Sequence, residues 1–258
     1  MNKEQAYRAL IDDVKEYYTA QEAIHKKDPV YLTWYDDCKE INLWTYWQGH
    51  RNLNAKIMLV GQDWGSPADS SEEYMAQFAE INEGKQSSYW LDGTSITDEN
   101  LIKLFSSIGY TVSSEAPWNP NLFFTNFVLG YRNKGFSGSF RSRWLIENKD
   151  FFSRLANIIE PKVIICLGRN AFRGVMMAFD KKVHIGNYNA FITGENNPVE
   201  LSLASGQKVA VFAEAHCGAM GTLNRNRLKA PDGTTGIELQ KRDWTKIKDY
   251  LESVSTTT

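Results

Sequence analysis

Three short apolar segments of this chain each run into a polar residue, and this pattern constrains the fold more than any other feature. The segments are Lys56–Val60 before Gly61-Gln62-Asp63, Leu122–Thr125 before Asn126, and Val209–Ala213 before Glu214-Ala215-His216. Continuous apolar runs of this length are typical of strands buried on both faces of a parallel sheet. The carboxyl ends of such strands share one edge, where open α/β sheets bind ligands. We therefore expect Asp63, Asn126 and His216 to lie close together.

A fourth strand is predicted over Val163–Leu167, and helical patterns separate the strands. Helices are predicted over residues 2–27, 72–81, 98–108, 144–159, 170–179 and 238–254, whereas residues 183–208 are irregular with room for a hairpin. This alternation favours an α/β fold, a three-layer α/β/α sandwich around a central, mostly parallel four-stranded sheet. Because no linker or repeat is visible, we expect one domain over residues 1–258, with residues 1–54 as a helical and aromatic cap.

Composition narrows the class of protein. The chain has 42% hydrophobic residues, so it can bury a core without disulfides. Its net charge is −2, so any nucleic-acid binding must use a local basic face. No apolar run approaches the roughly 18 residues of a membrane span, and the charged N-terminus lacks a signal peptide. We therefore expect no membrane partner and a cytoplasmic location.

The cysteines and histidines indicate no cofactor. Cys38, Cys166 and Cys217 are scattered, which argues against a disulfide framework, and they are too few for a four-cysteine iron–sulfur cluster. The four histidines show no ligand spacing with one another or with the cysteines. We expect no metal, no iron–sulfur cluster and no other cofactor.

The polar residues at the strand ends admit both chemical and structural interpretations. Asp63, in Gly61-Gln62-Asp63-Trp64-Gly65, either orients a water and stabilises a sugar cation or caps a turn. The Asn126 amide either pairs with the edge of a base or satisfies its own polar atoms by hydrogen bonds within the protein. His216 either donates a hydrogen bond to developing negative charge or is structural.

Two segments, residues 116–146 and 217–230, carry positive charge and contain no acidic residue. They are either phosphate-contact patches or solvated loops. Met220 and Leu223 suit a wedge that enters a base stack, or they anchor their loop in the core. The basic residues of the two segments are Arg132, Lys134, Arg141, Arg143, Arg225, Arg227 and Lys229.

Taken together, these segments resemble the uracil-DNA glycosylase superfamily over about residues 55–227. GQDWG resembles the first family motif, GQDPY in the uracil-specific branch, and LFFTNFV resembles the LLLN segment. PKVIICLGRNAF resembles the central strand of the family, and HCGAMGTLNRNR occupies the place of the loop that contains HPS. The order and the spacing of all four segments agree with the family.

The resemblance implies a monofunctional DNA glycosylase, a monomer with DNA as its partner. Such an enzyme flips a nucleotide out of the DNA and hydrolyses the bond between base and deoxyribose, leaving an abasic site. Asp63 would handle the water and the sugar cation, Asn126 would read a pyrimidine edge, and His216 would hydrogen-bond O2 of the departing base. Met220 falls at the intercalating position, and no lysine is placed for a lyase step. The resemblance also assigns a base-binding role to Gln62, Trp64, Gly65, Tyr89 and Trp90.

The chain departs from the family pattern at the base pocket and in the histidine loop. Trp64 replaces the usual Pro of the first motif, Gly65 replaces the Tyr that blocks the pyrimidine 5-position, and Cys217-Gly218 follows His216. The middle of the chain resembles the iron–sulfur branch without the cluster cysteines. Gly65 permits a base with a 5-substituent, so the predicted substrate is uracil or a modified pyrimidine. The modified pyrimidines include the 5-substituted cytosines of phage DNA. The predicted biological role is therefore either DNA repair or phage defence.

Two other classes of function remain open. A non-catalytic nucleic-acid-binding module that keeps the fold is motivated by the divergent His216 loop. A nucleotide hydrolase on a doubly wound sheet would need a metal site, and no carboxylates are spaced for one.

Overall fold

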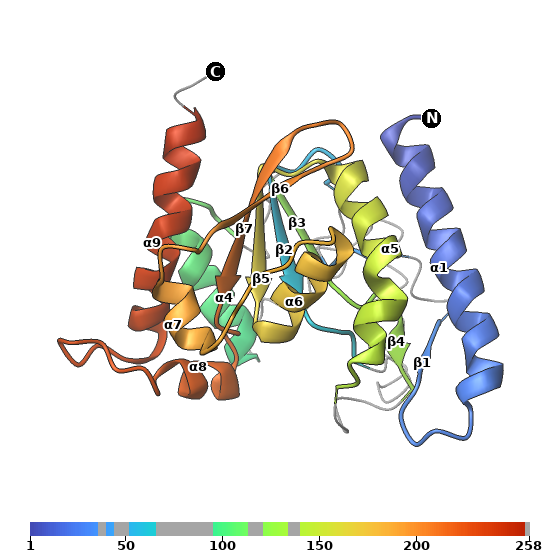
Figure 1. The fold of residues 1–258 in the computed structure, drawn as a ribbon, viewed down its shortest axis with the longest axis horizontal. Coiled ribbons are helices and arrows are strands. Elements are labelled where there is room, and N and C mark those ends of the chain that lie inside the picture. The colour runs from blue at the N-terminus through green and yellow to red at the C-terminus, as the bar shows by residue number, and fades with distance from the viewer. Residues whose placement is uncertain (36–39, 44–51, 66–94, 113–120, 134–139, 256–258) are drawn as a thin grey trace.

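The central sheet has five strands in the order β3-β2-β5-β7-β6 (Figure 1). Four of them are parallel, and β6 pairs antiparallel with β7 at one edge. The computed structural model describes residues 1–35, 40–43, 52–65, 95–112, 121–133 and 140–255. The strands are β2 (Ile57–Gly61), β3 (Leu122–Asn126), β5 (Val163–Leu167), β6 (Val199–Ser202) and β7 (Lys208–Glu214).

All four predicted strands are present, but the predicted number of four strands is wrong because β6 extends the sheet. Its residues alternate between buried and exposed, as in an edge strand with one solvated face, so they form no continuous apolar run. A turn through Gly206, at φ 86°, joins β6 to β7. The irregular segment thus contains a hairpin.

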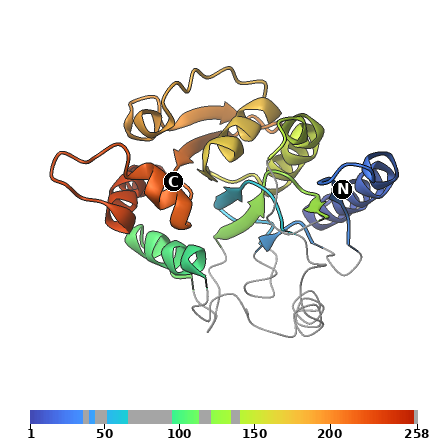
Figure 2. The same ribbon diagram turned by 90° about the horizontal axis from the view of Figure 1, so that it is seen from below.

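Helices cover both faces of this sheet (Figure 2). On one face, Phe105 of α4 stacks on Phe124 of β3 with ring centroids 5.1 Å apart. On the other face, Tyr7 of α1 meets Phe123, the neighbouring residue of β3, edge to face at 6.3 Å. Neighbouring residues of a strand point to opposite faces, so the fold is a mixed α/β sandwich, as predicted.

Helices α1, α4, α5, α6 and α9 lie close to predicted positions, whereas α7 and α8 lie in segments for which no helix was predicted. The predicted helix over residues 72–81 lies outside the described residues, and none of the described helices is long and apolar enough to cross a membrane. Two short strands, β1 (Leu32–Thr33) and β4 (Tyr131–Arg132), pair with each other apart from the main sheet. The helices are α1 (Lys3–His25), α4 (Ile96–Ser107), α5 (Arg143–Ile159), α6 (Arg169–Ala178), α7 (Tyr188–Thr193), α8 (Ala219–Arg225) and α9 (Gly236–Ser255).

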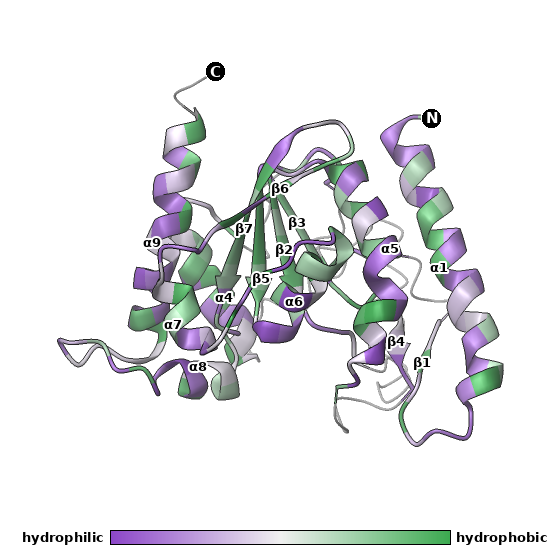
Figure 3. Ribbon diagram, viewed as in Figure 1, coloured by the Kyte–Doolittle hydropathy of each residue, from purple (hydrophilic) through white to green (hydrophobic). Residues whose placement is uncertain are grey.

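The strands are buried between helices, so only the ends of the strands can present polar residues to a ligand. The parallel strands are largely hydrophobic, whereas the covering helices also carry hydrophilic residues (Figure 3). At the carboxyl end of β5, Gly168 has φ 92° and caps α6, a conformation that favours glycine over residues with a Cβ. This sharp turn brings the start of α6 beside the ends of β2 and β7.

Candidate functional site

Asn126 and the first motif meet at the ends of β3 and β2. Asn126 pairs in register with Gly61, and a Cβ on Gly61 would lie 2.2 Å from Oδ1 of Asn126. The Asn126 side chain therefore lies across the backbone of Gly61, in space that only glycine leaves free. Within the described part of the chain this amide makes no hydrogen bond. Its donor and its acceptor are thus available to a ligand.

The Asp63 carboxylate is held on both oxygens. The amide of its neighbour Gln62 donates from Nε2 to Oδ1 over 2.9 Å, and Arg132 donates from Nε to Oδ2. Asn170, in the first turn of α6, donates in turn from Nδ2 to Oε1 of Gln62 over 2.7 Å. The side chains of Arg132 and Asp63 are only 5% and 7% exposed. Asp63 is therefore an oriented, shielded anion.

Arg132 reaches Asp63 because β4 runs beside the segment that follows β2. The amide N–H of Arg132 donates to the carbonyl of Trp64 over 3.4 Å, and Trp64 forms a parallel bridge with Tyr131. The guanidinium also lies over the ring of Trp144, 5.2 Å from its centroid. This burial corrects the prediction that Arg132 is a surface contact for phosphate, because its charge faces Asp63.

His216 lies just beyond the end of β7 and is set for hydrogen-bond donation in its neutral form. The amide of Gly218 donates to Nδ1 over 3.0 Å, so in the neutral ring the proton is on Nε2. Burial lowers the pKa of His216 below its usual value, and the charge of Asp63 opposes this shift. By surface area the residue is nevertheless exposed, so the protein atoms that lower its pKa enclose the ring only on part of its surface. Nε2–H is therefore a neutral donor at the edge of the site.

These residues share one edge of the sheet. Only β5 separates β2 from β7, and neighbouring strands lie about 4.8 Å apart, so the ends of β2 and β7 are about 10 Å apart. Gly168 lies between them and is adjacent to His216: a Cβ on this glycine would lie 3.9 Å from the Cβ of the histidine. The structure thus places Gln62, Asp63, Asn126 and His216 at one edge of the sheet, the edge at which the sequence predicts them.

Other predicted base-binding residues are placed differently. Trp64 is 4% exposed and its ring packs on Tyr131 with centroids 5.2 Å apart, so it belongs to the core rather than to an open face. Gly65 follows it at the end of the described segment. Tyr89 and Trp90 lie outside the described residues.

The other residues predicted to contact phosphate differ in their exposure and in their partners. Arg225 is 2% exposed and forms two hydrogen bonds to Asp243 of α9, at 2.6 and 2.8 Å, so the prediction that it binds DNA is wrong. Arg141 and Arg143 both donate to Oδ2 of Asp28, at 3.2 and 2.9 Å, and stay part-exposed. Arg227 is exposed, and Lys134 lies outside the described residues.

The apolar residues of α8 point outward. Met220 and Leu223 are 69% and 60% exposed. Residues three positions apart share a helix face, whereas Arg225 lies on the opposite face of the same helix, against α9. An apolar ridge therefore stands beside His216.

Cys217 follows His216 directly but has no reactive thiol. Its side chain is buried and contacts the carbonyl of Thr97, with Sγ 3.6 Å from the oxygen. Burial raises the pKa of Cys217 to about 12, so the thiolate is scarce at neutral pH. Asn100 donates to its carbonyl over 2.7 Å, so α4 fixes the His216 loop here.

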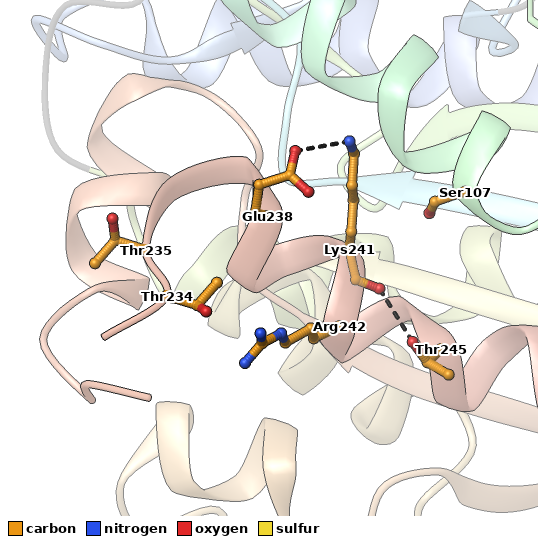
Figure 4. Close-up of a pocket in the computed structure, with 7 residues that line it drawn as sticks. All are labelled: Ser107, Thr234, Thr235, Glu238, Lys241, Arg242 and Thr245. Carbon is orange, nitrogen blue, oxygen red and sulfur yellow. Dashed lines mark hydrogen bonds and ion pairs between the residues drawn. The ribbon is translucent and has the colours of Figure 1, made fainter. Parts of the chain in front are cut away.

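A hollow of about 640 Å³ between α4 and α9 shares no residue with this site (Figure 4). Its two cations are paired, Lys241 with Glu238 and Arg242 with Asp232, both at 2.7 Å. Among the described residues, no group of three or more His, Cys, Asp or Glu side chains is arranged to hold a metal ion.

Sequence reasoning missed Asn170 and the contact between Arg132 and Asp63. Asn170 follows a buried strand just as Asn126 does, so the same rule of polar residues after strands would have found it. Nothing in the spacing indicates that β4 turns Arg132 inward. Comparison of the chain with protein-family models and with curated protein sequences gives no match.

Proposed function

We propose that this protein is a monofunctional DNA glycosylase that hydrolyses the N-glycosidic bond of an extruded pyrimidine nucleotide. The observation that carries the proposal is the meeting of a shielded carboxylate, a free amide and a neutral imidazole at one sheet edge. These groups come from Asp63, Asn126 and His216. An aspartate beside a sugar, a bidentate amide on a base edge and a donor on a leaving group are what this reaction requires.

In the proposed reaction the bond between C1′ of the deoxyribose and N1 of the base breaks, and its electron pair leaves with the base. The Asp63 carboxylate stabilises the positive charge that develops on the sugar. Nε2–H of His216 donates to O2 of the departing anion, and the Asn126 amide reads its edge. Water adds to C1′ and its proton ends on the base or in solvent, which gives a free base and an abasic site.

DNA contact is proposed along the same edge. Met220 and Leu223 form an exposed apolar ridge beside His216, suited to fill the stack vacated by a flipped base. Arg227 lies next to this ridge and is exposed. The ridge would hold the duplex open while the site holds the base.

Release of free base from matched oligonucleotides tests the proposal. Substrates carry uracil, 5-hydroxymethylcytosine or glucosylated cytosine, since Gly65 in place of a tyrosine motivates the 5-substituted bases. We expect wild-type protein to release one of these bases and to leave alkali-labile sites. Asp63→Asn and His216→Ala should each lower the rate by about 100-fold or more. No release from any substrate at excess enzyme contradicts the proposal.

One observation favours the alternative of a non-catalytic DNA-binding module, namely that both Asp63 oxygens are already paired. This alternative predicts DNA binding that survives Asp63→Asn and His216→Ala, with no turnover by the wild type. Wild-type turnover that Asp63→Asn abolishes rules it out.

A further inference from the structure

Arg132 is a cation that contacts the proposed catalytic carboxylate, and its side chain is shielded from solvent. Its Nε donates to Oδ2 of Asp63, and both side chains are shielded from water. Hydrogen bonds between ionised partners are stronger than neutral ones, and low exposure preserves them from screening. The pair is therefore a persistent feature of the site.

We infer that Arg132 is a positioning residue, which holds Asp63 as an oriented anion that stabilises the sugar cation. The inference rests on the proposed function. The charge-assisted bond from Arg132 fixes the direction of one carboxylate oxygen and leaves the negative charge of Asp63 beside the sugar. A carboxylate has about four lone-pair sites, and Arg132 and Gln62 occupy one on each oxygen. The remaining sites can still orient a water.

The groups that face Asp63 fit this role. Arg132 comes from β4 and is its cation, and His216, beyond β7, faces it as an imidazole whose pKa is lowered by burial. Gln62 and Asn170 are neutral and form a relay in which each amide donates toward the carboxylate. With the imidazole neutral, the described surroundings of Asp63 supply one positive charge, that of Arg132.

The experiment compares Arg132→Met and Arg132→Lys with wild type, and uses Arg154→Met as the matched control. Arg154 is an exposed arginine of α5 paired with Asp13, so its loss removes one cation and one ion pair outside the site. We expect Arg132→Met to lower kcat by about 10- to 100-fold with little change in KM. Arg132→Lys should recover part of this loss, because it restores the positive charge.

Salt dependence separates positioning from phosphate contact. A phosphate contact contributes about 0.9 to the slope of log binding constant against log salt concentration. We expect the slope of Arg132→Met on an abasic-site duplex to equal that of wild type. A slope lower by about 0.9, with kcat unchanged, overturns the inference and restores the phosphate role.

Carbon-13 NMR of the aspartate carboxyl groups tests the pair without any turnover. The Asp63 signal is assigned with Asp63→Asn, and its chemical shift at neutral pH should differ between Arg132→Met and wild type, because the cation that contacts Oδ2 is gone. An unchanged chemical shift in Arg132→Met, with a cooperative thermal unfolding transition, overturns the inference. If wild type releases no base yet the Asp63 signal moves as expected, the proposed function fails while the charge pairing stands.

Discussion

At the scale of single residues, the position of the Asn126 amide depends on a neighbour that has no side chain. Gly61 leaves the volume in which Oδ1 of Asn126 lies. The amide makes no hydrogen bond within the described chain, so packing against the Gly61 backbone is what places it. An amide held by packing is sensitive to a single methyl group on the next strand.

Gly61→Ala should therefore displace the amide and lower base release by roughly 10- to 100-fold, because misplacement by about 1 Å has this effect on rate. The free energy of unfolding should fall by about 1–3 kcal/mol, the usual effect of overpacking. Rates on the oligonucleotide substrate and urea denaturation check the two effects. In an Asn126→Ala background the same methyl group has no amide to displace, so it should change the rate little. An equal loss in both backgrounds would show that Gly61 acts by another route.

The arginines mark the limit of what the sequence predicts at this scale. Arg132, Arg225 and Arg227 all lie in segments without acids, and each was predicted to meet a phosphate. Arg132 and Arg225 instead pair with Asp63 and Asp243, which are distant in the sequence. Local charge counting cannot detect such partners, because pairing depends on which helix or strand lies opposite.

At the scale of elements, α8 presents a basic partner to α9 and an apolar ridge to solvent. The Arg225–Asp243 pair joins the two helices with both residues buried. Removing one member of a buried pair leaves an uncompensated charge, which costs more than the pair itself contributes. The ridge of Met220 and Leu223 depends on this attachment.

Arg225→Ala should lower the free energy of unfolding by about 3–5 kcal/mol, because Asp243 then remains buried and unpaired. Arg227→Ala, the matched exposed arginine, should change it by less than about 0.5 kcal/mol and reduce the salt slope of DNA binding by about 0.9. Urea denaturation and binding titrations at several salt concentrations measure both. A stable Arg225→Ala protein with a reduced salt slope would return Arg225 to the DNA interface.

The sequence predicts the elements that are buried and long. The parallel strands are continuous apolar runs, and α1, α5 and α9 show clear helical patterns, so their positions are confirmed. The edge strand β6 and the seven-residue helix α8 are not predicted as such, since a half-solvated strand and a short helix with Gly221 have weak patterns. Tertiary contacts with β7 and α9 stabilise them instead.

At the scale of the whole molecule, a second carboxyl group is buried near α9, two residues before His216. Glu214, the last residue of β7, points to the side of α9, and its Oε1 has no hydrogen-bond partner in the described structure. Its backbone carbonyl accepts from Tyr188 over 3.0 Å and from the Gly168 amide over 2.7 Å. The strand end that carries His216 is thus fixed by the backbone while the Glu214 carboxyl is left in the core.

Burial raises the pKa of Glu214 well above 4.5, and the charge of Asp243 raises it further, whereas Lys246 and Arg225 lower it. Below pH 4.5 the folded and unfolded chains both hold this proton. As the pH rises past 4.5 the unfolded chain releases it and the folded chain retains it. Stability is therefore fully present at low pH and is lost as the pH rises toward the folded-state pKa.

Glu214→Gln keeps a neutral group of similar shape, so it should remove this loss. The gap in free energy of unfolding between the variant and wild type should grow in favour of the variant above pH 4.5, by at most about 1.4 kcal/mol per pH unit. Urea denaturation from pH 4 to pH 8 measures the gap, and Glu200→Gln, an exposed carboxylate on β6, provides the baseline to subtract. A gap that stays flat over this range would mean that Glu214 is ionised in the folded protein, with Lys246 and Arg225 outweighing its burial.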